Sequence, residues 1–192
     1  NTVFADLASF DRAGTGVCNQ LHKEFLLMAR VLFVETDIRN EKLGIMYLSA
    51  ALKKNGHRTM LCWYEKEDID NLIESFSPDY VAFSLVTGTH RRSLDIAGEI
   101  KNRYNKAIIV GGPHATFFSH GIPEAAADFI IVGHGETAII DIVEGRTQDR
   151  LLKYNFCDLN EISFPDRELF NRFKEFRDNP MKNVITTRDC PY

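Results

Sequence analysis

Short runs of consecutive, mostly apolar residues strongly limit what this chain can fold into. They are VLFV (residues 31–34), YVAFSL (80–85), AIIV (107–110) and FIIV (129–132). Short strands that are apolar at nearly every position are buried on both faces, and such strands are typical of parallel sheets covered by helices on both sides. With 44% hydrophobic and 26% charged residues, the 192-residue chain can supply the core that this arrangement needs.

The segments between these runs carry helix signals, and the alternation predicts a doubly wound α/β fold. LGIMYLSAALKKN, for example, has apolar residues at helical spacing and is followed by Gly56, a common residue just after a helix end. Right-handed crossovers then give a Rossmann-like or flavodoxin-like domain with a parallel five-stranded sheet over residues 30–145. Helices are expected over residues 43–55, 69–76, 93–104, 122–127 and 136–144. Residues 59–64 are expected to be the second strand along the chain, and the four apolar runs are the other strands.

Both flanks of this domain depart from the pattern. Residues 1–29 show no sustained periodicity, and Met28 resembles a natural protein start, so we interpret this segment as an N-terminal extension that need not be native; a short helix over residues 20–27 is the alternative. Residues 146–183 carry prolines and many charges, and are expected to be a linker with one short helix over residues 167–173. A new strand, residues 184–187, is expected to open the last segment, residues 184–192.

Composition and absent motifs argue against several classes of function. A net charge of −4 does not suit a nucleic-acid partner, and no run of about 18 apolar residues offers a membrane span. Widely spaced cysteines and the lack of a signal peptide indicate a reducing cytoplasm. No G-x-G-x-x-G follows the first strand, and neither a P-loop motif nor G-x-S-x-G occurs, which disfavours dinucleotide, P-loop and α/β-hydrolase sites.

The loops after the strands are where a site is expected, because ligands of open parallel sheets bind beyond the carboxyl ends of the strands. VTGTH (86–90), GGPHAT (111–116) and GHGE (133–136) are rich in glycine and small polar residues. Each has a simpler explanation alone: a tight turn at the glycine pair, a surface or capping role for His114, a helix start at Glu136. Because the loops converge on one edge, the residues predict a site for a sizeable, partly polar ligand.

Four segments, taken in order, resemble one known family. LGIMYLSAALKKNGH, PDYVAFSLVTGT, AIIVGGPHAT and ADFIIVGHGE are similar to the cobalamin-binding domain of B12-dependent radical SAM enzymes, and DLNEISFPDRELF resembles the connector that follows it. The terminal VITTRDCPY resembles the first strand of the radical SAM barrel with the first cysteine of its C-x-x-x-C-x-x-C motif. The resemblance covers residues 30–192, with two departures: His134 stands where glutamate is usual, and Asp189 where glycine is usual.

The resemblance implies a corrinoid site at the carboxyl edge of the sheet, with the corrin ring across this edge and its nucleotide tail directed towards residues 111–116. The D-x-H-x-x-G motif that supplies a cobalt-binding histidine is absent, and Arg39 stands in the histidine's place. Base-off cobalamin without a protein histidine on cobalt is therefore expected. The resemblance assigns ring or tail contacts to Ser84, Val86 and Thr87, the tail pocket to Gly111, Gly112 and His114, and its far side to Gly133, Gly135 and Glu136.

The same resemblance gives the end of the chain a role. Cys190 would be the first of three thiolate ligands of a [4Fe–4S] cluster that binds S-adenosylmethionine, the others lying in a missing radical SAM domain beyond Tyr192. An isolated thiol is the alternative. The full-length protein is then expected to be a radical SAM enzyme, in most members a methyltransferase, whereas this part alone is not catalytic. A free-standing corrinoid or nucleotide sensor, and a member that has lost its ligand, remain alternatives.

Overall fold

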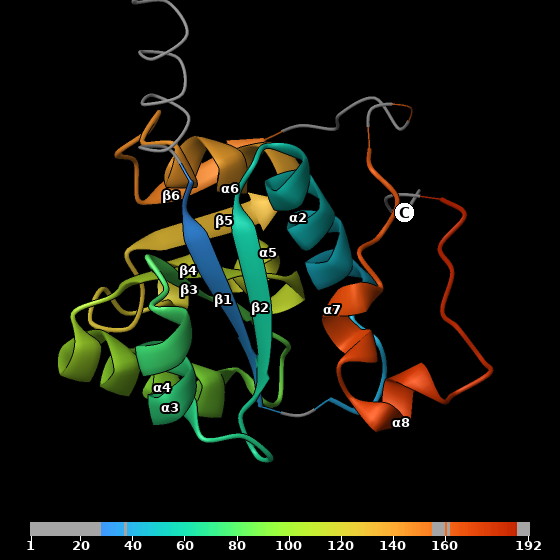
Figure 1. Ribbon diagram of the computed structural model, residues 1–192. Coiled ribbons are helices and arrows are strands. Elements are labelled where there is room, and N and C mark those ends of the chain that lie inside the picture. Colours follow the sequence, from blue (N-terminus) through green and yellow to red (C-terminus); the bar gives the residue numbers. More distant parts are fainter. Residues whose placement is uncertain (1–27, 37, 155–159, 161, 188–192) are drawn as a thin grey trace, which may run out of the picture.

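The computed structural model shows an open sheet of six parallel strands with helices on both faces (Figure 1). It describes residues 28–36, 38–154, 160 and 162–187. The strands are β1 (Arg30–Glu35), β2 (Arg58–Trp63), β3 (Tyr80–Ser84), β4 (Ala107–Gly111), β5 (Phe129–Gly133) and β6 (Leu151–Tyr154). The helices are α2 (Leu43–Lys54), α3 (Ile69–Phe76), α4 (His90–Tyr104), α5 (Pro113–Phe118), the 3-10 turn η1 (Ser119–Gly121), α6 (Glu136–Val143), α7 (Glu168–Asn171) and α8 (Lys174–Arg177).

The strand order reverses direction between β1 and β3. The order across the sheet is β2-β1-β3-β4-β5-β6, and every neighbouring pair is parallel. This is the flavodoxin-like order with one strand added, so the predicted doubly wound fold is confirmed. The loops after β1 and β3 diverge at this switch point, which opens a crevice at the carboxyl edge of the sheet.

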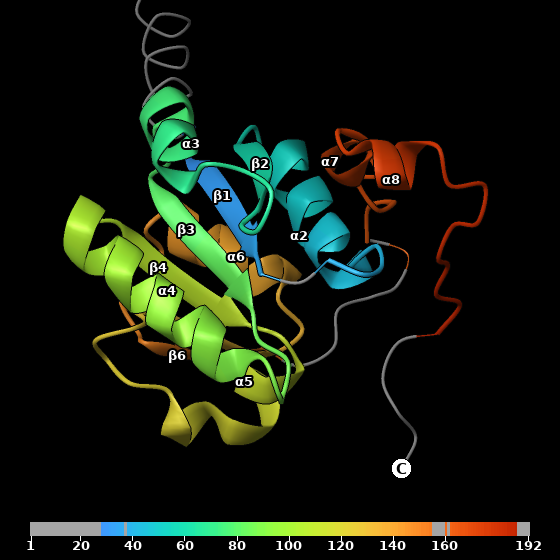
Figure 2. The same ribbon diagram turned by 90° about the horizontal axis from the view of Figure 1, so that it is seen from below.

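Alternate residues of the strands serve two separate cores. In β1, Val31 and Phe33 pack with α2, α6, α7 and α8, whereas Leu32 and Val34 pack with α3, α4 and α5. Figures 1 and 2 show these two helix groups on opposite faces of the sheet. The strands are thus buried on both sides, as their continuous apolar sequence predicted.

Three predictions about individual elements were wrong. Residues 122–127 form a turn, closed by hydrogen bonds from the Ala126 and Ala127 N–H groups to the Pro123 carbonyl, and the helix of this crossover is α5. α5 was missed because GGPHATFF resembles a loop, yet Pro113 is well suited to the first helical position. The sheet has six strands rather than five, and β6 falls in the expected linker. Residues 184–187 form no strand, because none of the described strands pairs with them.

The segment after β6 packs back onto the face that carries α2. The Asp166 carboxylate accepts a hydrogen bond from Ser49 Oγ at 2.6 Å and lies 2.7 Å from Lys53 Nζ. Around Trp63, the segment places the aromatic rings of Phe173 and Phe176 at centroid distances of 5.6 and 5.9 Å. Residues 166–177 therefore form part of the domain's own core, although residues 146–183 were expected to be a linker.

Candidate functional site

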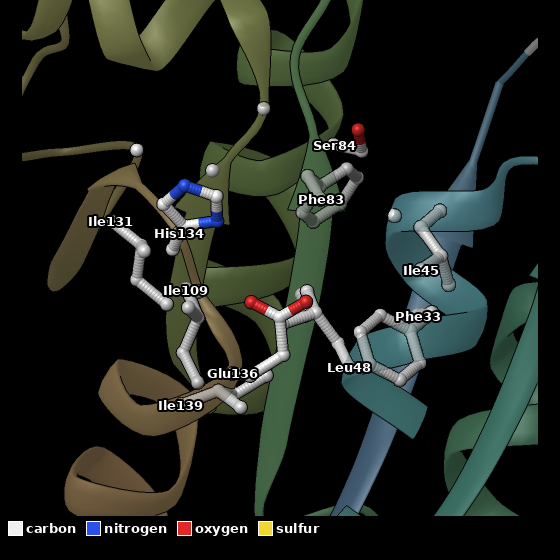
Figure 3. A pocket seen from close by; sticks show the side chains of 16 residues that line it. Phe33, Ile45, Leu48, Phe83, Ser84, Ile109, Ile131, His134, Glu136 and Ile139 are labelled. Atoms are coloured by element: carbon white, nitrogen blue, oxygen red, sulfur yellow. The ribbon is translucent and has the colours of Figure 1, made fainter. Parts of the chain in front are cut away.

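A cavity of about 320 Å³ opens at the carboxyl edge of the sheet, between the sheet and the first turns of α2 and α6 (Figure 3). We call it the apolar cavity, because most of its lining side chains are aliphatic or aromatic. Four neighbouring strands form one wall and the two helices form the other. It is lined by Phe33, Gly44, Ile45, Leu48, Ala82, Phe83, Ser84, Ile109, Gly111, Gly112, Ile131, Gly133, His134, Gly135, Glu136 and Ile139.

Strand register divides this cavity into two levels. Phe33 pairs with Ala82 and Ala82 with Ile109, so these three buried residues form one row across β1, β3 and β4. Two residues nearer the carboxyl edge, Ser84 pairs with Gly111. The upper row therefore carries little or no side chain, and this leaves the space that the cavity occupies.

Two of the cavity's glycines also have a structural reason to be glycine. A Cβ atom at Gly112, whose φ is +91°, would lie 2.9 Å from both Leu85 O and Ser84 Oγ. A Cβ at Gly135 would lie 3.0 Å from Leu48 Cδ2, because the start of α6 closely approaches α2. The glycine-rich loops thus let the backbone pass close to β3 and to α2, and keep the walls of the cavity in place.

Polar side chains gather at the mouth of the apolar cavity. Ser84 ends β3, and His134 and Glu136 belong to the turn from β5 into α6. Figure 3 shows the imidazole of His134 and the carboxylate of Glu136 directed towards the cavity. A ligand here would bury an apolar group against the sheet and place polar atoms at the edge.

A second cavity of similar volume, about 320 Å³, lies at the switch point between β1 and β3. Its lining is mostly polar, and the Glu35 carboxylate in it lies 2.9 Å from Lys42 Nζ with only 4% of its side chain exposed. Ser84 lines both cavities, so they adjoin at the end of β3. The second cavity is lined by Glu35, Thr36, Arg39, Asn40, Glu41, Lys42, Ser84, Val86, Thr89 and Ser93.

Comparison with protein families supplies a ligand class for the domain. Residues 29–143 match the family model of the B12 binding domain, which is more than half of the chain. This chain belongs to the B12-binding domain family. The family's ligand class is a cobalamin or related corrinoid, and the matched range includes every residue that lines the two cavities.

The other comparisons add little to this. No curated protein matches the chain in sequence. Among solved structures, it is similar to a hydroxyethylthiazole kinase from Pyrococcus horikoshii OT3, at 20% identity and a TM-score of 0.39, over 67% of this chain and 50% of that chain. The chain spans about half the length of that protein, and a similarity this weak supports no argument about fold or function.

The structure of this B12-binding domain brings together most, but not all, of the predicted site residues. Val86 lines the second cavity, whereas Thr87 and His114 line neither. His134 was missed as a site residue, although its departure from the family pattern could have drawn attention to it. The apolar cavity collects Ser84, Gly111, Gly112, Gly133, Gly135 and Glu136.

His114 lies in a small cluster beside the candidate site. Its Nδ1 lies 3.0 Å from Thr87 Oγ1, and its ring stacks on His90 at a centroid distance of 3.8 Å. Partial burial, and secondarily the neighbouring His90, lower the pKa of His114 below its ordinary value. The structure therefore supports a positioning role for His114, in which it ties the start of α5 to the loop after β3.

The predicted cluster ligand, Cys190, lies outside the described residues. Within the part of the chain that the structure describes, no group of three or more histidine, cysteine or acidic side chains is arranged to hold a metal ion. Cys62 is buried, and burial raises the pKa of its thiol to about 12, which keeps it protonated and unreactive. None of the described helices combines the length and apolar character needed to cross a membrane.

Proposed function

We propose that this B12-binding domain holds cobalamin with its nucleotide tail in the apolar cavity and its corrin ring over the carboxyl edge of the sheet. One observation carries this proposal: a cavity of about 320 Å³ with an apolar floor opens where β3 and β4 end in Ser84 and Gly111. A flat aromatic base fits such a space, and burial of its apolar surface contributes roughly 25 cal/mol per Å².

The polar residues take the other parts of the ligand in this proposal. Ser84, His134 and Glu136 surround the point where the tail leaves the apolar cavity, so they meet the ribose. Val86 and the second cavity, including Arg39 and Asn40, face the amide side chains of the ring. Thr87 and His114 act indirectly, because their hydrogen bond holds the loop after β3 in place.

The proposal includes base-off binding without a protein histidine on cobalt. A base inside the apolar cavity cannot also bind the cobalt of its own corrin ring. The loop between β1 and α2 contributes Arg39 to the second cavity, where a cobalt-binding histidine would otherwise be expected. The domain's own residues then bind and orient the cofactor, which supplies a transferable methyl group when it is bound.

For the full-length protein, we propose a radical SAM enzyme of the reducing cytoplasm, with methyl transfer as its reaction. The support is the resemblance of the connector and of VITTRDCPY to that family. Cys190 would then be one of three ligands of a [4Fe–4S] cluster that binds S-adenosylmethionine, in a radical SAM domain that follows this one.

A pair of glycine variants tests the position of the tail. Gly111→Leu should fill the apolar cavity with little strain, since a Cβ there would meet only Ile131, at an ordinary 3.7 Å. Gly121→Leu is the matched control, because Gly121 is exposed and a Cβ there would meet nothing within 4 Å. In equilibrium dialysis with hydroxocobalamin, Gly111→Leu should weaken binding by at least about tenfold, a loss of about 1.4 kcal/mol.

The control should bind like the wild type, and circular dichroism should show both variants folded. Equal affinity of Gly111→Leu and the wild type would place the tail elsewhere and contradict the proposal. Gly112 is a poorer position for this test, because any side chain there would press on Leu85 O and Ser84 Oγ and disturb the fold itself.

A further inference from the structure

The floor of the apolar cavity offers a ligand no hydrogen-bonding side chain. Phe33, Ala82 and Ile109 form its sheet wall and are at most 5% exposed. Leu48 from α2 and Ile139 from α6 face them across the cavity (Figure 3). Of the polar side chains in the lining, Ser84 and His134 lie at the carboxyl edge, whereas Glu136 projects from the first turn of α6, on the wall that faces the sheet (Figure 3).

The backbone N–H and C=O groups of the floor are also unavailable to a ligand. Phe33, Ala82 and Ile109 lie in ladders in which β1, β3 and β4 are each paired on both sides. In a parallel sheet the N–H and C=O groups point along the sheet towards neighbouring strands, so the face of the sheet presents side chains alone. A polar atom pushed against this floor would lose its water and find no partner.

Corrinoids differ from one another in the base at the end of the nucleotide tail. In cobalamin the ring farthest from the ribose is a benzene ring with two methyl groups. In the adenine-containing analogue the ring farthest from the ribose is a pyrimidine ring with nitrogen atoms on its edge. A tail that enters the cavity base first presents this far ring to the floor.

We propose that the apolar cavity selects among corrinoids by their lower base, and prefers a benzimidazole to adenine. The inference rests on the proposed function, because it needs the tail in this cavity. The benzimidazole methyl groups gain apolar contacts with Phe33, Ala82 and Ile109, whereas the adenine nitrogens lose their hydrogen bonds to water. Sites without a hydrogen-bonding partner discriminate against polar groups because the unpaired atom is costly to bury.

The direct test compares three corrinoids on the same 192-residue chain by equilibrium dialysis: hydroxocobalamin, its adenine-containing analogue, and diaquacobinamide, which has no base. Hydroxocobalamin should bind at least about tenfold more tightly than either of the others. Equal binding of the two complete corrinoids would overturn the inference and leave the proposed function standing. Cobinamide that binds as tightly as cobalamin would show that the base does not use the cavity, and would also overturn it.

If none of the three corrinoids binds, the proposed function fails together with the inference.

A substitution in the floor assigns the preference to this surface. Ala82→Ser adds one hydroxyl group at a buried position of the floor row, at nearly constant volume. It should reduce the preference for cobalamin over the adenine analogue severalfold, because the hydroxyl group can pair with a ring nitrogen.

Ala125→Ser is the matched control, because Ala125 is exposed in the turn before β5 and does not line the cavity. It should leave the preference unchanged. A preference that Ala82→Ser does not alter would place the discrimination outside the floor and contradict the assignment. If Ala82→Ser does not fold, the comparison of the three corrinoids on the wild-type chain still decides the proposal.

Discussion

At the scale of single residues, the candidate site depends on positions that carry small side chains or none. Gly111 and Ser84 leave the upper level of the apolar cavity open, and Gly112 and Gly135 let the backbone approach β3 and α2. The glycine-rich sequence of these loops predicted a ligand site at this edge of the sheet. It could not predict the aliphatic floor, because Ala82 and Ile109 look like ordinary strand residues until the fold places them beside an empty space.

The cluster of His114, His90 and Thr87 gives a residue-scale prediction about pH. The pKa of His114 is lowered from its ordinary value of 6.5, so the unfolded chain binds a proton more readily than the folded protein does. The contribution of His114 to stability is therefore present above about pH 6.5 and is lost as the pH falls towards its folded pKa. His114→Asn should show a smaller fall in melting temperature between about pH 7 and about pH 5 than the wild type.

The measurement is a series of thermal unfolding curves for both proteins across this pH range. The asparagine side chain of the variant keeps a polar group near Thr87, so the comparison isolates the titrating imidazole. Parallel curves for the variant and the wild type would mean that protonation of His114 is not linked to folding.

At the scale of elements, the segment with α7 and α8 belongs to the domain. Asp166 binds Lys53 and Ser49 on α2, and the Glu41 carboxylate lies 2.9 Å from Arg167 Nη1 and 3.1 Å from Lys182 Nζ. Glu41 also lines the second cavity, so the C-terminal segment contacts the loop that borders the candidate site. These contacts join residues more than a hundred positions apart, which is why sequence patterns indicated only a linker there.

Two acidic residues of this segment form a matched pair for a stability test. The Asp166 carboxylate lies 2.7 Å from Lys53 Nζ, and its side chain is 8% exposed. The Glu168 carboxylate lies 3.9 Å from the same atom, and its side chain is 90% exposed. Asp166→Ala removes a buried carboxylate that accepts a hydrogen bond from Ser49 and pairs with Lys53, and should lower the free energy of unfolding by about 1–3 kcal/mol. Glu168→Ala should change it by less than about 0.5 kcal/mol, as is usual for exposed ion pairs.

Urea unfolding of the two variants and the wild type measures both changes. If Asp166→Ala were as stable as Glu168→Ala, the buried contacts of Asp166 with α2 would stabilise the fold no more than an exposed ion pair does, which would contradict the prediction.

At the scale of the whole molecule, the apolar runs were sufficient to predict the parallel sheet and its helices. They could not reveal β6, because LLKY is a short edge strand in which only Leu152 is buried, so it lacks the continuous apolar pattern of the central strands. They also suggested a strand at residues 184–187, where β-branched residues have no described partner. The position of the candidate site was predicted from topology, since ligands of such sheets bind at the carboxyl edge near the switch point.

The central claim is that this domain binds cobalamin with the lower base removed from cobalt and placed in the apolar cavity. A UV–visible titration of methylcobalamin with the 192-residue chain tests it most directly. We expect a saturable shift of the visible band to shorter wavelength, as occurs when the benzimidazole leaves cobalt. A spectrum that stays base-on at saturation, confirmed by dialysis, or no binding at all, would contradict the claim.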